Sequence, residues 1–241
     1  MRDYLVIYLK CWINIILYYR NVYPLTSFTL TTFNVFNLPQ QIPINRNPKL
    51  INYIETLIAD IVDDKLINLS LSSITVAIIE IENNNETIKG KTHITNDNVI
   101  VEKYILDFQE FQYDNIKLSS SPNDDDACGK EMIFQEFRSS LNNFTNFIKN
   151  LPYGFKDGQV KFKVFIECLD QMLGLDPGRD VKFNWALRRK HELFHVNNNI
   201  EENFIFQDNE NNIPVQNCKK SLGCCVIGEN KVIYHLFESL K

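Results

Sequence analysis

The residues most suggestive of chemistry form a short pattern in the C-terminal part of the chain. His191, Glu192 and His195 match H-E-x-x-H, in which two histidines one helical turn apart bind zinc and the glutamate acts as general base. The extended form of this motif would place Gly and His where this chain has Asn198 and Glu201. A zinc metallopeptidase is therefore kept as an alternative, and a solvated or interface turn of helix is the preferred interpretation.

The six cysteines raise a second metal hypothesis. Cys218, Cys224 and Cys225 could join His195 in a structural zinc site, but their spacing differs from the C-x2-C knuckle of zinc ribbons. We interpret the three as buried thiols on a short strand, and all six as reduced, as in the cytosol or nucleus. Because no glycine-rich phosphate loop or serine-nucleophile motif occurs either, the sequence predicts no catalytic residue, no metal and no cofactor.

Composition predicts one globular domain. The chain has 241 residues, of which 44% are hydrophobic and 23% charged, so it can bury a sizeable core without disulfides. The net charge of −5 and the lack of a long basic run argue against a protein that binds by neutralising phosphates. No segment approaches the ~20 apolar residues that span a bilayer. We expect neither direct nucleic-acid binding nor membrane association.

Periodicity predicts the elements that would position these residues. Apolar residues at three- and four-residue steps predict helices over 4–23, 48–61 and 130–150, the first ended by Pro24 and the second capped by Asn47. β-Branched and alternating runs predict strands over 73–82, 99–108, 161–167, 224–227 and 232–237, the first two as a long-looped hairpin. The simplest arrangement is an α+β domain, with helices packed on one face of a largely antiparallel sheet.

Several motifs, in register along most of the chain, resemble the HORMA-domain family. The run from Ile16 to Pro24 matches the family's I-L-Y-x-R-x-x-Y-P signature at the end of the first helix. The runs that resemble the second helix, the V-E-K-F strand and the central helix are 47–54, 101–104 and 136–141. The resemblance implies a single HORMA domain over 1–241, with a core at 1–168 and a mobile C-terminal "safety belt" at 169–241.

Within the family, the N-P-K-L-x-x-Y-I and V-E-K-Y runs are most similar to members that serve as the accessory, non-catalytic subunit of translesion DNA polymerase zeta. That similarity implies a non-enzymatic nuclear adaptor whose belt closes over a Pro-containing peptide of the polymerase's catalytic subunit. The adaptor would link this subunit to a scaffold translesion polymerase and other repair factors. A spindle-checkpoint HORMA protein, which binds an activator of the anaphase-promoting complex, is the alternative within the family.

The resemblance also assigns roles to single residues. Tyr23, Tyr53 and Trp185 stand where family members contact the trapped peptide, the alternative being ordinary core aromatics. Arg138 stands where two HORMA domains pair, either two copies of this chain or one copy with another HORMA protein; its alternative is a solvated side chain. The face that docks the second partner is carried over onto Ile213, Pro214, Val215 and Tyr234.

Overall fold

The computed structural model describes residues 2–31, 41–66, 71–81, 99–111, 127–152, 154–168, 218–227 and 231–240. The α-helices of this part are α1 (Arg2–Tyr19), α2 (Pro48–Asp60) and α4 (Ala127–Lys149). Its strands are β1 (Phe28–Thr31), β2 (Ile42–Asn45), β3 (Leu71–Glu80), β4 (Val99–Asp107), β5 (Val160–Cys168), β6 (Cys218–Val226) and β7 (Val232–Ser239). A 3-10 turn, η1 (Leu25–Ser27), precedes β1, and a π-helical turn, η2 (Ile61–Lys65), continues α2. Within these ranges no helix has the length and apolar character needed to cross a membrane.

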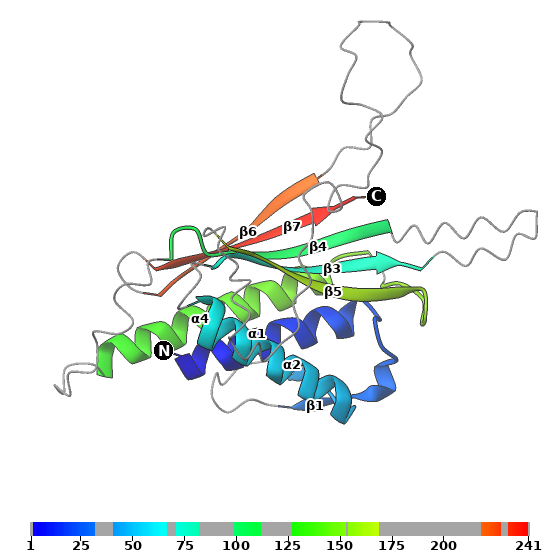
Figure 1. Ribbon diagram of the computed structural model, residues 1–241, viewed down its shortest axis with the longest axis horizontal. Helices are drawn as coiled ribbons and strands as arrows, with labels where there is room; N and C mark the ends of the chain where they lie inside the picture. The colour runs from blue at the N-terminus through cyan, green and yellow to red at the C-terminus, as the bar shows by residue number, and fades with distance from the viewer. Residues whose placement is uncertain are drawn as a thin grey trace, which may run out of the picture.

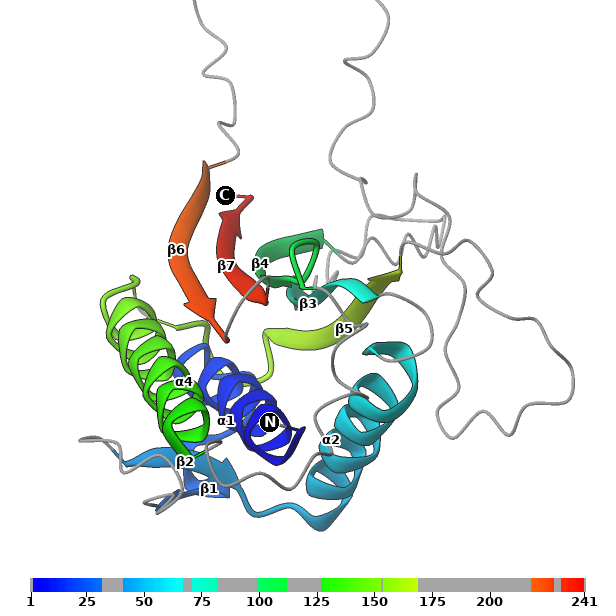
Figure 2. The same cartoon turned by 90° about the vertical axis from the view of Figure 1, so that its left-hand side faces the viewer.

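The elements form three layers (Figures 1 and 2). A five-stranded antiparallel sheet has the order β5-β3-β4-β7-β6 and lies on one side of α1, α2 and α4. The antiparallel ribbon β1–β2 lies on the other side of the helices. This arrangement confirms the predicted α+β class. The sequence analysis did not predict the strands of this ribbon. Each is only four residues long, and β2 contains Pro43, a residue that is disfavoured within strands.

Helix α1 is the centre of the core. The sequence predicted one apolar stripe, but the helix is buried on nearly all sides, because the sheet, α2, α4 and β2 surround it. Its buried polar residue, Asn14, donates to the carbonyl of Lys10 at 2.8 Å and accepts from the backbone N–H of Asn45 at 3.0 Å. Asn14 therefore attaches β2 to the central helix without leaving a polar group unpaired.

The predicted end of α1 was wrong by four residues. The helix ends at Tyr19, because Asn21 adopts a left-handed conformation with φ of 52°. The N–H of Val22 bonds to the carbonyl of Leu17 at 3.0 Å, and that of Asn21 bonds to Tyr18 at 3.2 Å. This is a Schellman cap with asparagine at the left-handed position, so the helix stops before Pro24 can end it.

The other two helices match their predictions more closely. The side chain of Asn47 accepts from the N–H of Lys49 at 3.0 Å and caps α2, which Pro48 begins. Helix α4 starts three residues earlier than predicted. Its predicted inner residues Phe137, Leu141, Phe144 and Ile148 are buried.

The predicted long-looped hairpin is the pair β3–β4, with a bulge between Ile78 and Ile79. The two C-terminal strands are longer than predicted and form the hairpin β6–β7, in which β7 pairs with β4. Strands β5 and β6 lie at the two opposite edges of the sheet, as far as the structure describes it. Residues 169–217 stand between these two strands in the sequence.

Candidate functional site

Two of the three aromatic residues predicted to contact a peptide meet on one strand. Tyr23 follows α1, Tyr53 lies on α2, and both rings pack edge-on against Phe162 of β5, with centroids 6.2 and 6.1 Å away. All three side chains are half-buried. Burial raises the pKa of both tyrosines, so their hydroxyls are protonated at neutral pH. Trp185, the third aromatic residue, lies outside the described residues.

Strand β5, which carries Phe162, is an outer strand of the sheet in the part of the chain that the structure describes. Three of its helix-facing side chains, Phe162, Val164 and Ile166, pack on the core but are only partly buried. Val164 is half-buried, for example, whereas its partner Val76 on β3 is fully buried. Lys163 is exposed, as predicted for the solvent face of a half-buried strand. An outer strand lined by half-covered apolar side chains suits recognition by strand addition.

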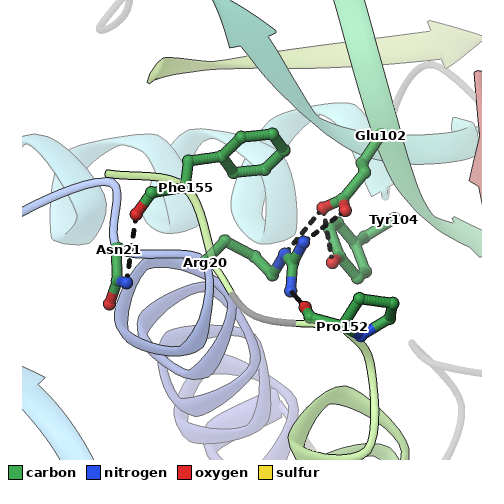
Figure 3. Close-up of polar contacts among 6 residues, drawn as sticks. All are labelled: Arg20, Asn21, Glu102, Tyr104, Pro152 and Phe155. Carbon is green, nitrogen blue, oxygen red and sulfur yellow. Dashed lines mark hydrogen bonds and ion pairs between the residues drawn. The ribbon is translucent and has the colours of Figure 1, made fainter. Parts of the chain in front are cut away.

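A buried ion pair supports this region (Figure 3). Arg20, at the end of α1, donates from Nε to Oε2 of Glu102 at 2.8 Å and from Nη2 to Oε1 at 2.5 Å. Its third nitrogen donates to the carbonyl of Pro152 at 2.9 Å, and its guanidinium lies over the ring of Phe155 at 5.2 Å. The Arg20 side chain is 4% exposed, so this pair connects α1, β4 and the segment after α4 inside the protein.

Tyr104 completes the ion-pair network by donating its hydroxyl to Oε2 of Glu102 at 2.9 Å. Burial, together with the neighbouring Glu102 carboxylate, raises the pKa of Tyr104 well above its usual value. Sequence reasoning noticed Arg20 and Glu102 only as members of two separate motifs. A buried arginine and a buried glutamate each require a partner, but their burial becomes visible only in the structure.

Gly154 allows the segment after α4 to approach the end of α1. A Cβ at this position would lie 2.9 Å from the carbonyl oxygen of Tyr19 and 2.9 Å from the side-chain nitrogen of Asn21. We expect Gly154→Ala to lower the free energy of unfolding by about 1–3 kcal/mol in urea denaturation, because backbone must move to admit the methyl group. Gly158→Asn shows the cost of losing a glycine without a clash: apart from its chain neighbours, no atom lies within 4 Å of a Cβ placed there, and Asn is among the side chains that adopt a φ of +77° most readily. Equal stability of Gly154→Ala and the wild type would contradict this reading.

The residues predicted for other partners lie elsewhere. Tyr234 is on β7, two strands beyond β3 in the strand order, and donates to Oε2 of Glu110 at 2.6 Å. Arg138 is half-exposed on α4 and donates to Gln135 at 3.4 Å, one turn away on the same helix. Ile213, Pro214 and Val215 lie outside the described residues. The structure therefore separates Tyr234 from the Tyr23–Phe162–Tyr53 cluster, and the roles of Tyr234 and Arg138 stay predictions.

The cysteines partly contradict the interpretation as buried thiols. Cys225 is buried, which raises its pKa to about 12, but Cys224 is exposed, because consecutive residues of a strand point to opposite faces. Cys11 and Cys168 are free thiols as well. Among the described residues no three His, Cys, Asp or Glu side chains gather as metal ligands. The pattern His191-Glu192-His195 lies outside these residues.

Sequence reasoning missed one buried polar cluster. The hydroxyl of Tyr8 on α1 lies 2.6 Å from Nε2 of His235 on β7, and Oγ of Ser140 on α4 lies 3.0 Å from both atoms. Burial lowers the pKa of His235 to about 4, so the imidazole is neutral at neutral pH. The three residues are far apart in the sequence, and Tyr8 and His235 stand within apolar runs, so no local pattern predicts that they meet.

Comparisons with known proteins identify the fold. A model of the HORMA domain matches residues 4–167 of this chain. The chain belongs to the HORMA-domain family. This HORMA protein is also 37% identical over 219 residues to the DNA polymerase zeta processivity subunit of Saccharomyces cerevisiae, a match that covers 90% of this chain and 76% of that protein.

Solved structures share the same fold at low identity. One chain of the mitotic checkpoint complex superposes with a TM-score of 0.58 and 10% identity, covering 99% of the HORMA protein and 97% of that chain. HTP-2 of C. elegans, bound to the HIM-3 closure motif, gives a TM-score of 0.53 and 9% identity over 99% and 89% of the two chains. At these identities the likeness establishes the fold alone.

The family match settles the class of protein. The matched model is that of a HORMA domain and the yeast relative is a processivity subunit, so this HORMA protein is not an enzyme, as predicted. The match gives no support to a zinc metallopeptidase or to a checkpoint protein.

Proposed function

We propose that this HORMA protein is an accessory subunit of translesion DNA polymerase zeta. It traps a Pro-containing peptide of the catalytic subunit in the nucleus and links that subunit to a scaffold translesion polymerase and other repair factors. The observation that carries the proposal is the 37% identity to a polymerase zeta processivity subunit over 90% of the chain. The position of two aromatic side chains beside an outer strand supports it.

The peptide adds as a strand at the outer side of β5, where main-chain hydrogen bonds provide affinity and side-chain pockets provide selectivity. Tyr23 and Tyr53 flank Phe162 and offer aromatic faces on which a proline ring packs. Proline lacks a backbone N–H, so it fits an added strand only where no ladder hydrogen bond is needed. The belt at residues 169–241, which includes the hairpin β6–β7, closes over the bound peptide.

A second face of the protein serves the scaffold polymerase. We assign it to Tyr234 together with Ile213, Pro214 and Val215, and we assign pairing with a second HORMA domain to Arg138. Support for a separate face comes from the strand order, which places β7 away from β5. Two partners that use opposite sides of the sheet can bind at the same time.

Affinity purification of the tagged full-length chain from nuclear extract tests the proposal. Captured proteins are identified by mass spectrometry, and their binding segments are mapped by truncation. Recovery of the polymerase zeta catalytic subunit through a short Pro-containing segment is the expected result. Recovery of checkpoint proteins without the polymerase would contradict the proposal and favour the checkpoint alternative.

Removal of an aromatic anchor tests the site. We expect Tyr53→Ala and Trp185→Ala each to weaken capture of that segment by about 2 kcal/mol, or roughly 30-fold in Kd, as for central aromatic residues of interfaces. Isothermal titration calorimetry measures Kd, and circular dichroism verifies the fold. Glu55→Ala is the control on α2, because Glu55 is half-exposed and pairs with Lys10 of α1 instead. An unchanged Kd for either aromatic variant would remove that residue from the site.

A further inference from the structure

The Tyr8–Ser140–His235 cluster joins the C-terminal hairpin to the helices. On β7 the buried, helix-facing side chains are Ile233, His235 and Phe237, and His235 is the polar one. It meets Tyr8 and Ser140, on α1 and α4. The ring of Tyr8 also stands edge-on to the imidazole at 5.9 Å. Three residues from two helices and the hairpin are thus joined through one set of polar atoms.

These polar contacts hold the hairpin in one position. His235 pairs with Leu106 on β4 and with Gly223 on β6. A slip of two residues along β4 would bring Ile233 or Phe237 to the hydroxyls of Tyr8 and Ser140, which would then be buried without partners. An apolar contact such as Phe237 on Phe147, at 5.3 Å, has no comparable directional requirement. The cluster therefore specifies the register as well as the attachment.

Residues 169–217 are preceded in the sequence by β5 and followed by the hairpin β6–β7. Strand β5 pairs with β3 along its whole length, from Cys168 to Val160. The hairpin is the end that detaches more readily, because β7 pairs with β4 at six positions whereas β5 pairs with β3 at nine. The strength of hairpin docking then limits how fast an enclosed segment escapes.

We propose that Tyr8, Ser140 and His235 form a polar latch, which holds the β6–β7 hairpin against α1 and α4 and sets how long a captured peptide stays bound. Its effect on the peptide rests on the proposed function, whereas its effect on the hairpin does not. The three residues act as positioning residues, since Tyr8 and Ser140 contact His235 of the hairpin and none of the three lies on β5, where the peptide is proposed to add.

Hydrogen exchange of the free full-length chain tests the latch directly. Tyr8→Phe removes one oxygen and keeps the ring, and His235→Leu removes the other partner. Both variants should exchange the amides of β6 and β7 about fivefold to tenfold faster than the wild type, as expected for loss of one net hydrogen bond, and leave β3 unchanged. Tyr18→Phe is the matched control on α1, because Tyr18 packs against Tyr19 and Phe28 instead.

Peptide release is the second measurement. Overlapping peptides of the polymerase zeta catalytic subunit are labelled with fluorescein, and the dissociation rate of the strongest binder is measured. Tyr8→Phe should raise this rate about fivefold with a smaller change in association rate. Faster exchange in β3 and β7 alike, or no change in β7, would overturn the latch. A wild type that captures no peptide, while Tyr8→Phe still loosens β6–β7, would overturn the proposed function and leave the latch supported.

Discussion

Glu102→Gln is expected to lower the free energy of unfolding by about 3–5 kcal/mol, the largest effect of any single change considered. The substitution keeps the shape of the side chain but leaves the guanidinium of Arg20 buried without a counter-charge. It also weakens the hydrogen bond that Tyr104 donates to the carboxylate. Urea denaturation followed by circular dichroism measures the change, read from the midpoint at constant m value.

Two further variants sharpen this test. Glu55→Gln makes the same change in the exposed pair Lys10–Glu55 and should cost less than about 1 kcal/mol. The double variant Arg20→Met/Glu102→Leu should lose less stability than Glu102→Gln alone, because no buried charge is then left uncompensated. A Glu102→Gln protein no less stable than Glu55→Gln would show that the pair adds nothing to stability.

Stability should also fall steeply on mild acidification, by about 3 kcal/mol from His235. Its pKa is about 4 in the fold against 6.5 in the unfolded chain, because burial disfavours the imidazolium. A lowered pKa means that the stabilisation is complete above pH 6.5 and is lost as the pH falls from 6.5 toward 4. Tyr8 behaves oppositely, because burial raises its pKa well above the value of 10 in the unfolded chain. Its contribution to stability is therefore complete below pH 10 and is lost only as the pH rises above 10.

The acid prediction is measured as the difference between wild type and His235→Leu at each pH. Carboxylates titrate in both proteins, so the difference isolates His235. The wild type should lose stability relative to the variant between pH 6.5 and 4.5. A constant difference over this range would mean that His235 is not the group responsible.

Local patterns predicted the elements whose ends are determined locally. Asn47 and Pro48 specify the start of α2 through one side-chain hydrogen bond and one fixed φ, and both effects are visible in two adjacent letters. The same kind of reasoning mispredicted the end of α1. Pro24 is the stronger stop signal in the sequence, but the left-handed Asn21 ends the helix before Pro24 is reached. Two cap signals close together cannot be ranked from sequence alone.

Long-range contacts could not be predicted in this way. The pairing of Arg20 with Glu102, and of Tyr8 with His235, depends on the order of the strands, which periodicity does not supply. The resemblance to HORMA proteins named Tyr23 and Tyr53 but not Phe162, the side chain on which they meet. Phe162 looked like an ordinary alternating strand residue because its special position arises only from β5 being an outer strand.

The insertion of β7 between β4 and β6 has a consequence for how the protein is made. Strands β3, β4 and β5 are complete once residue 168 has left the ribosome, but the partner of β4 on its other side comes from residues 234–239. During synthesis of the intervening residues, β4 is a temporary edge with unpaired backbone groups, and Phe237 is not yet present to cover Tyr104. The nascent chain therefore passes through an interval in which it is open to aggregation and to chaperones, until β7 pairs with β4.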